Sequence, residues 1–239
     1  MYKNQKICVV MPAYNAAKTL VNTYSDLPHD LVDQVILVDD CSQDNTVAIA
    51  KTLPIHVTVH PENRGYGGNQ KTCYKTAVEM GGDVIIMVHP DHQYDPKFIP
   101  EFIKTMVDDN YLAVFGSRMI NKRGALDGGM PKWKFIANIG LTKFANLFLG
   151  TSFTELHSGF RAYSRKIFDL IDIEKNSDDF IFDTQIIIQL IDKGVKIKEI
   201  PITTRYFPEA SQISFKRSVE YGLGILKNIF LYKTGLRKF

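Results

Sequence analysis

The sequence is poor in the features that identify several classes of protein. Its three cysteines, Cys8, Cys41 and Cys73, lie in separate segments without metal-type spacing, so we expect neither a disulfide framework nor a cysteine metal site. A reducing cytoplasm fits this usage best. The N-terminus lacks the apolar run of a signal peptide, and no uncharged apolar stretch reaches the ~18 residues that a membrane span needs. The net charge of +3 is too small to indicate a nucleic-acid partner.

Two nucleotide-binding signatures are missing as well. No Gly-x-Gly-x-x-Gly follows the first apolar run, which disfavours a dehydrogenase. The glycine-rich segment 63–71 lacks the Gly-Lys-Ser/Thr ending of a P-loop. Its glycines still permit close approach of a ligand to the backbone, and a helix that begins near Asn69 would offer free N–H groups to an anion. This segment is therefore a weak candidate for phosphate binding.

What the sequence does contain indicates one large α/β domain. Its 239 residues, 45% of them hydrophobic, are enough for a sizeable core. Short apolar runs, mostly β-branched, alternate with segments of helical character, which predicts a mostly parallel, Rossmann-like sheet flanked by helices. We expect strands at 7–11, 35–38, 55–59, 84–88 and 113–116.

Polar residues follow several of these runs at the point where each strand is expected to end. The first run leads into Pro12-Ala13-Tyr14-Asn15, the second into Asp39 and Asp40, and the fifth into Ser117 and Arg118. Because ligands bind at the carboxyl ends of the strands in open α/β sheets, we expect a binding site where these residues meet. Adjacent aspartates repel each other, so Asp39 and Asp40 require a partner rich in hydrogen-bond donors.

The run at 84–88 leads into a candidate metal site. His89, Asp91 and Gln93 alternate with Pro90 and His92, so their side chains would point the same way in a locally extended backbone. Imidazole, carboxylate and amide groups together can ligate a divalent cation. The competing interpretation is a polar loop that follows a core strand.

The second half of the chain continues the α/β pattern. We expect a glycine-rich loop at 124–130, a helix at 131–149, a short strand after Arg161, a helix at 180–191 with Asp183 in its first turns, and a strand at 195–200. A basic C-terminal helix is expected at 211–232, which divides the chain into a domain at 1–210 and a helix with its tail at 211–239. An apolar stripe on this helix either packs on the domain or rests on an anionic membrane surface. The stripe comprises Phe215, Val219, Leu223, Leu226 and Phe230.

Six loose motifs in this order resemble those of the family 2 glycosyltransferases, over nearly the whole chain. The nearest branch resembles the dolichyl-phosphate mannose and glucose synthases and their prokaryotic relatives. The resemblance implies a GT-A fold. The motifs are Pro12-x-Tyr14-Asn15, Asp39-Asp40-x-Ser42-x-Asp44-x-Thr46, Asn63-x-Gly65, the segment His89-x-Asp91-x-Gln93, Gly116-Ser117-Arg118 and Ser158-Gly159-Phe160-Arg161.

The resemblance implies roles for the strand-end residues. The donor would be a nucleotide-diphosphate sugar, a UDP- or GDP-hexose, and a divalent cation, Mn²⁺ or Mg²⁺, would bridge its diphosphate. The cation ligands would be His89, Asp91 and Gln93. His89 replaces the aspartate usual in the family, which removes one charge and favours Mn²⁺. The residues that would hold the nucleotide sugar are Pro12, Ala13, Tyr14, Asn15, Asp39, Asp40, Asn63, Gly65 and Gln70.

The implied reaction is an inverting transfer in which Asp91, Arg118 and Asp183 take part. A polyprenyl (dolichyl or undecaprenyl) phosphate acceptor needs no general base, and Arg118 and Arg205 would hold its phosphate. A hydroxyl acceptor needs a carboxylate base, for which Asp183 is the first candidate and Asp179 the second. A non-catalytic relative that binds nucleotide sugars stays as an alternative. We expect a cytoplasmic protein that can contact the membrane surface from that side.

Overall fold

The fold is a seven-stranded sheet between two layers of helices. The computed structural model describes residues 1–206 and 215–236. The strands lie in the order β3-β2-β1-β4-β6-β5-β7, and every pairing is parallel except those of β6, which runs antiparallel to β4 and β5. This arrangement confirms the predicted GT-A type of sheet. The strands are β1 (Ile7–Ala13), β2 (Gln34–Asp39), β3 (His56–Val59), β4 (Val84–Met87), β5 (Ala113–Ser117), β6 (Arg161–Ser164) and β7 (Ile197–Pro201).

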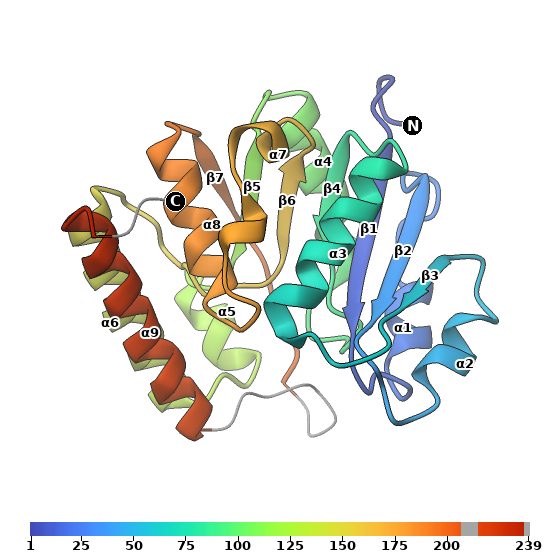
Figure 1. The fold of residues 1–239 in the computed structure, drawn as a ribbon, viewed down its shortest axis with the longest axis horizontal. Helices are drawn as coiled ribbons and strands as arrows, with labels where there is room; N and C mark the ends of the chain where they lie inside the picture. Colours follow the sequence, from blue (N-terminus) through green and yellow to red (C-terminus); the bar gives the residue numbers. More distant parts are fainter. Residues whose placement is uncertain (207–214, 237–239) are drawn as a thin grey trace.

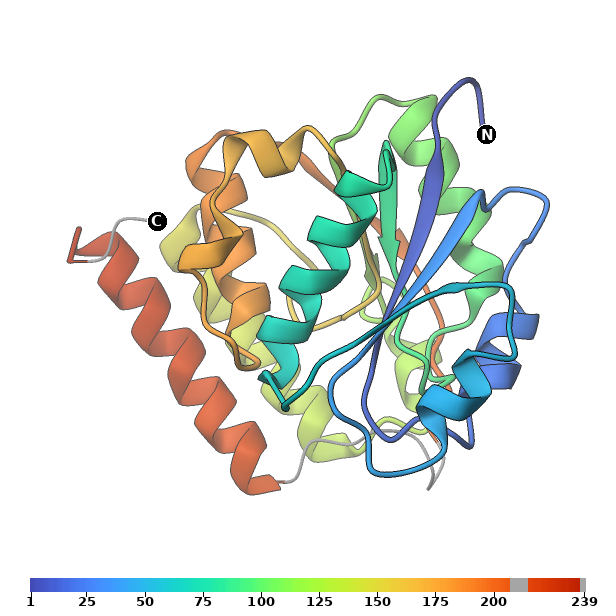
Figure 2. The same ribbon diagram turned by 45° about the vertical axis from the view of Figure 1, so that its right-hand side comes forward.

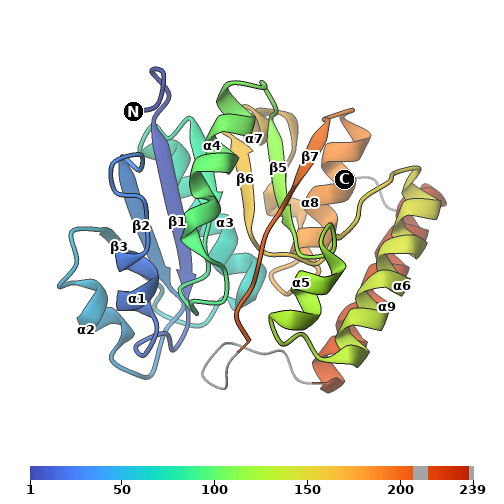
Figure 3. The ribbon, with the colours of Figure 1, turned by 180° about the vertical axis from the view of Figure 1, so that it is seen from behind.

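Each face of the sheet has its own hydrophobic core, because neighbouring residues of a strand point to opposite faces. Cys8 and Val10 of β1 join the core under α3 (Gly65–Glu79) and α8 (Phe182–Asp192), which Figure 1 shows in front of the sheet. Ile7, Val9 and Met11 join the core under α1 (Leu20–Ser25) and α4 (Ile99–Val107), which Figure 3 shows on the other face. Burial on both faces explains why these strands read as continuous apolar runs.

Two long helices lie beside each other past the β7 end of the sheet. They are α6 (Lys132–Leu149) and α9 (Phe215–Lys233), and they pack along most of their length (Figures 1 and 3). Figure 2 shows α9 along the outer side of the domain, away from α1 and α2. The remaining helices are short: α2 (Thr46–Ala50), η1 (Pro96–Phe98), α5 (Lys122–Asp127), α7 (Ile167–Leu170) and η2 (Ile173–Lys175).

Two local predictions are wrong. The segment expected to be a glycine-rich loop is largely helical, because α5 covers 122–127. Helix α3 begins at Gly65 and not near Asn69, so the glycines form its first turn. A β-carbon at residue 67 would lie 2.3 Å from the Ser177 carbonyl oxygen, and glycine is what lets this turn pack against the chain at 177–178.

The C-terminal helix packs on the domain through residues other than its predicted stripe. Ile225 and Ile229 are buried, whereas Val219, Leu223 and Phe230 are exposed. The expected start of this helix at Ser211 and the basic tail residues Arg237 and Lys238 lie outside the described residues. Among the helices of the part that is described, none combines the length and apolar character needed to cross a membrane.

Candidate functional site

Two cavities open at the carboxyl ends of the strands and meet each other. The larger, about 860 Å³, lies beside the ends of β1 and β2, and the smaller, about 330 Å³, lies between the end of β4 and helices α6 and α9. Tyr66, His89, Asp91 and Phe180 line both. A molecule in one cavity can therefore touch a molecule in the other at this junction.

The larger cavity is lined by most of the residues predicted to hold a nucleotide sugar. Asn15 has the left-handed φ of +52°, and its side-chain oxygen accepts a hydrogen bond from Gln43 N at 2.8 Å. Two predicted residues lie behind the wall. Asp39 is fully buried and accepts hydrogen bonds from Ser42, and Gln70 is buried beside Tyr74 and Asp183. The predicted residues that line the cavity are Pro12, Ala13, Tyr14, Asn15, Asp40, Asn63 and Gly65.

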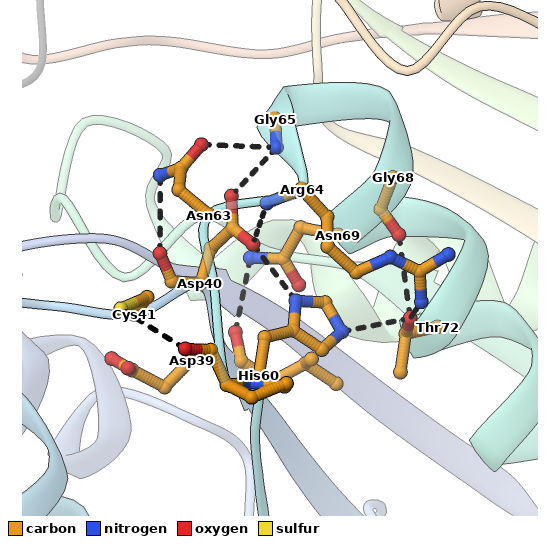
Figure 4. Close-up of polar contacts among 12 residues, drawn as sticks. Asp39, Asp40, Cys41, His60, Asn63, Arg64, Gly65, Gly68, Asn69 and Thr72 are labelled. Atoms are coloured by element: carbon orange, nitrogen blue, oxygen red, sulfur yellow. Dashed lines mark hydrogen bonds and ion pairs between the residues drawn. The ribbon is translucent and has the colours of Figure 1, made fainter.

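Asp40 occupies the N-terminus of α3 with its own carboxylate, as Figure 4 shows. Its Oδ1 accepts a hydrogen bond from Arg64 N at 2.8 Å, and its Oδ2 accepts one from Gly65 N at 3.0 Å. The N–H groups of Gly67 and Gly68 donate to the Asp178 carbonyl. The protein therefore supplies acceptors, one of them a carboxylate, for most of the N–H groups that the sequence suggested for a bound anion.

The segment after β4 is a turn and not the extended backbone that the alternation of residues suggested. β4 ends at Met87, His92 has a φ of +58°, and Asp91 Oδ1 accepts a hydrogen bond from Gln93 N at 3.0 Å. A turn closed by its own aspartate cannot align three alternate side chains as a strand does. His89 and Asp91 nevertheless line both cavities, and Gln93 lines the smaller one.

Burial sets the charge of the two titratable groups at the junction. It lowers the pKa of His89 to about 4, so the imidazole is neutral at pH 7. It raises the pKa of Asp91 to about 7, so the carboxyl group is close to half ionised there. The His89 ring stacks on Tyr66 with 5.7 Å between ring centroids, and a β-carbon at residue 159 would lie 2.7 Å from its Nε2. Gly159 thus makes the room that His89 occupies.

The side-chain atoms of His89, Asp91 and Gln93 could ligate a cation that takes most of its other ligands from a substrate. Among the described residues, no group of three His, Cys, Asp or Glu side chains could hold a metal. His89 turns Nε2 towards the Tyr66 hydroxyl, 3.4 Å away, which leaves Nδ1 as its possible ligand atom. Asp91 and Gln93 supply oxygen atoms, and Mg²⁺ and Mn²⁺ commonly combine one or two such ligands with substrate phosphates.

Asp183 lines the smaller cavity but is held by several donors. The Tyr66 hydroxyl donates to its Oδ2 at 2.9 Å, and Arg161 Nη1 lies 3.2 Å from its Oδ1. Arg161 is almost fully buried and also donates to the Ser158 and Leu156 carbonyls. Both oxygens of the Asp183 side chain are therefore already engaged by donors of the protein itself. Asp179 lines the larger cavity and pairs with Arg217 at 3.3 Å.

The two arginines predicted to hold an acceptor phosphate lie in different places. Arg118 lines the smaller cavity, where its Nε donates to Glu155 Oε1 at 2.9 Å and its Nη1 to the Tyr206 hydroxyl at 2.9 Å. Glu155 is buried, and although burial alone would raise its pKa, Arg118 keeps that pKa below its usual range. Arg205 does not line either cavity; it pairs with Asp95 at 3.1 Å.

Sequence reasoning missed several residues of the smaller cavity. Lys134 lines it from α6, and among the described residues it has no carboxylate partner. Burial, with a smaller contribution from Arg118, lowers its pKa. Trp133, Ala137 and Leu141 line the same cavity with a spacing of four residues, which places them on one side of the helix. No motif marks these positions, although their spacing is that of an amphipathic helix.

The sequence is similar to those of known glycosyltransferases. The profile of glycosyl transferase family 2 matches residues 8–171. An uncharacterised protein of Methanocaldococcus jannaschii is 34% identical over 84% of this chain and 82% of its own length. UDP-N-acetylglucosamine–dolichyl-phosphate N-acetylglucosaminyltransferase of Methanococcus voltae is 28% identical over 96% of both chains. Undecaprenyl-phosphate mannosyltransferase of Micrococcus luteus is 26% identical over 83% of both.

The fold is also similar to that of solved structures. Glucosyl-3-phosphoglycerate synthase of Mycobacterium tuberculosis, in complex with Mn²⁺, UDP-glucose and phosphoglyceric acid, aligns with a TM-score of 0.75. The alignment covers 98% of this chain and 82% of the other, with 17% sequence identity. At that identity the likeness concerns the fold alone.

The raised pKa of Asp91 leads to a test in the metal-free protein. An acid whose pKa is higher in the folded state than in the unfolded state favours folding at low pH, and this contribution is lost as the pH rises towards 7 and beyond. We therefore expect Asp91→Asn to raise the Tm in EDTA at pH 8, with a gain that shrinks towards pH 5. Added Mn²⁺ should raise the Tm of the unsubstituted protein only. Asp109→Asn, at an exposed position, is the control. If the Tm of Asp91→Asn at pH 8 were below that of the unsubstituted protein, Asp91 would not be a buried carboxylate with a raised pKa.

Proposed function

We propose that this chain, which belongs to glycosyl transferase family 2, transfers a hexose from a UDP- or GDP-sugar to a polyprenyl phosphate. The observation that carries the proposal is the meeting of two unlike cavities at His89 and Asp91. The larger is lined by amides, hydroxyls and carboxylates, and the smaller is lined by a lysine and by apolar residues of the same helix, α6. A donor and an amphiphilic acceptor can then react where the two meet.

The larger cavity is the proposed donor site. Its wall offers the exposed Tyr14 ring to a base, and Asp40 and Asn63 to the hydrogen-bonding groups of a nucleoside. Asp39 acts from behind the wall by holding Ser42, whose hydroxyl accepts a hydrogen bond from Asn15 N, and Gln70 contacts Asp183 of the smaller cavity. The names of the Methanococcus voltae relative and of the similar solved complex both include a UDP-sugar, which supports this donor class.

The smaller cavity is the proposed acceptor site. Glu155 neutralises most of the charge of Arg118, so Lys134 is the cation best placed for an acceptor phosphate. The apolar wall of Trp133, Ala137 and Leu141 suits the isoprenoid chain next to that phosphate. Two relatives carry dolichyl-phosphate or undecaprenyl-phosphate in their names. Arg205, which pairs with Asp95, would guide the acceptor only from outside the cavity.

The proposed reaction is an inverting displacement. An anionic oxygen of the acceptor phosphate attacks the anomeric carbon of the sugar, and the bond from that carbon to the nucleoside diphosphate breaks. This oxygen needs no general base, which agrees with an Asp183 carboxylate already engaged by Arg161 and Tyr66. Asp183 would instead orient the sugar. A bound Mn²⁺ or Mg²⁺ would stabilise the charge on the leaving diphosphate, and Asp91, Gln93 and His89 Nδ1 would hold it.

A transfer assay tests this function. The protein is incubated with a panel of UDP- and GDP-hexoses, undecaprenyl or dolichyl phosphate in detergent, and Mn²⁺ or Mg²⁺, and products are identified by mass. We expect a glycosyl phosphoprenol from at least one donor, and none from Asp91→Ala. Transfer only to sugar hydroxyls would replace the polyprenyl phosphate with a glycan acceptor, and no transfer to either would favour a non-catalytic relative.

The charge at the acceptor site gives a kinetic prediction. Lys134→Ala removes a partly buried cation, so we expect the KM for polyprenyl phosphate to rise roughly 10- to 100-fold, the range for loss of a charged hydrogen bond, with the donor KM unchanged. Lys132→Ala is the matched control, because Lys132 is an exposed lysine two residues earlier on α6. Equal acceptor KM values for the two variants would remove Lys134 from the acceptor site.

The exposed apolar residues of α6 and α9 support contact with a membrane surface. Ile136 and Leu147 on α6 are 69% and 78% exposed, and Leu223 and Phe230 on α9 are 62% and 57% exposed. Lysines such as Lys143 and Lys227 are exposed on the same two helices. Apolar side chains among lysines are the composition of a helix that lies on an anionic bilayer.

Vesicle co-sedimentation tests this contact. We expect the protein to sediment with vesicles that contain phosphatidylglycerol, less so at high salt, and Leu223→Ser/Phe230→Ser to lose most of this binding. Val59→Ser, an exposed apolar position at the other end of the sheet, should bind as before. Undiminished sedimentation of the double variant would mean that α9 does not make the contact.

A further inference from the structure

A buried histidine lies directly beneath the larger cavity without lining it. His60 follows β3, is 5% exposed, and donates its backbone N–H to the Asp39 carbonyl at 2.9 Å. Its ring joins two elements: Nδ1 lies 2.8 Å from Asp40 Oδ1, and Nε2 lies 2.9 Å from Thr72 Oγ1 on α3 (Figure 4). A carboxylate only accepts hydrogen bonds, so Nδ1 is the donor to Asp40.

The contact with His60 completes a set of three donors around Asp40. Oδ1 accepts from His60 and from Arg64 N, whereas among the described residues Oδ2 accepts only from Gly65 N. Each carboxylate oxygen has room for about two hydrogen bonds, so one acceptor position on Oδ2 stays unfilled. Asp40 lines the larger cavity, and an N–H or O–H group of a bound molecule can reach it there.

We propose that His60 is a positioning residue for donor binding. Resting on the proposed function, this inference states that His60 Nδ1 fixes the Asp40 carboxylate, so that its unfilled Oδ2 position faces a hydrogen-bond donor of the nucleoside. The N–H groups of two consecutive residues hold the carboxylate but leave it free to tilt about the line between them, and the imidazole of His60 adds a third donor that restricts this tilt.

A role in fold stability alone would have different consequences from a positioning role. The side-chain nitrogen of asparagine lies near the place of histidine Nδ1, and that of glutamine near the place of Nε2. His60→Asn therefore keeps a donor for Asp40 and loses the contact with Thr72, whereas His60→Gln does the reverse. Both remove a buried ring, so both should lower the Tm to a similar degree. Only a positioning role predicts that the two variants differ in their Kd for the nucleotide.

The test measures nucleotide binding by calorimetry, with UDP and GDP as probes, each with Mn²⁺. For the nucleotide that the unsubstituted protein binds, we expect His60→Gln to raise the Kd roughly 10-fold and His60→Asn to change it less than about 3-fold. Turnover at saturating donor should be unchanged in both. His56→Asn, at an exposed histidine at the start of β3, is the control and should match the unsubstituted protein.

Thr72→Val keeps the test decisive if His60→Gln fails to fold. It removes the partner of Nε2, together with the longer contacts of Thr72 Oγ1 to the Gly68 carbonyl and Arg64 Nη1, and leaves Nδ1 on Asp40, so we expect little change in nucleotide Kd. An equal rise in Kd for His60→Asn and His60→Gln, a large rise for Thr72→Val, or loss of turnover at saturating donor would overturn the proposal. If the unsubstituted protein binds neither nucleotide, the proposed function itself fails, and that result differs from a failure confined to the variants.

Discussion

Buried carboxylates require hydrogen-bond donors, and this requirement shapes both cavities. Asp40 takes donors from His60 and the start of α3, Asp183 takes them from Arg161 and Tyr66, and Glu155 takes them from Arg118. Removing Arg161 from Asp183, or Arg118 from Glu155, would leave an uncompensated buried charge at a cost of about 3–5 kcal/mol. Each pair joins segments distant in sequence, so the same contacts that satisfy charge also fix the walls of the site.

These contacts also decide which charges are left for a ligand. An arginine engaged by a buried glutamate attracts a phosphate less strongly than a lysine without a carboxylate partner. The smaller cavity is lined by one of each, because in the part of the chain that the structure describes Arg118 pairs with Glu155 and Lys134 pairs with no carboxylate. The neutral His89 adds no positive charge at the junction. With the proposed function, this balance favours an anionic acceptor head group near α6 and a cation that offsets the charge of the donor diphosphate.

The pattern of apolar runs predicted the sheet and the strand ends that carry the site, because burial on both faces and alternation with helices leave a clear periodic signal. The same pattern could not predict which side chains face a cavity. Gln70 looked like part of a binding loop but lies inside α3 behind the wall. His60 and Lys134 carry no motif. The place of His60 depends on its contacts with Asp40 and with Thr72 on α3, and the place of Lys134 depends on the packing of α6 against α9. His89, Asp91 and Gln93 follow the end of β4, as the apolar run predicts, but the backbone there is a turn and not the expected extended segment.

Photolabelling would test most directly whether a polyprenyl phosphate occupies the cavity between α6 and α9. An analogue with a photoreactive group on the isoprene unit next to the phosphate is bound with Mn²⁺ and the nucleoside diphosphate, irradiated, and mapped by peptide mass. Our account predicts labels within 131–149 and 215–233 that unlabelled polyprenyl phosphate prevents. Labelling confined to the loops around Tyr14 and Asn63, or labelling that the unlabelled lipid does not reduce, would contradict it.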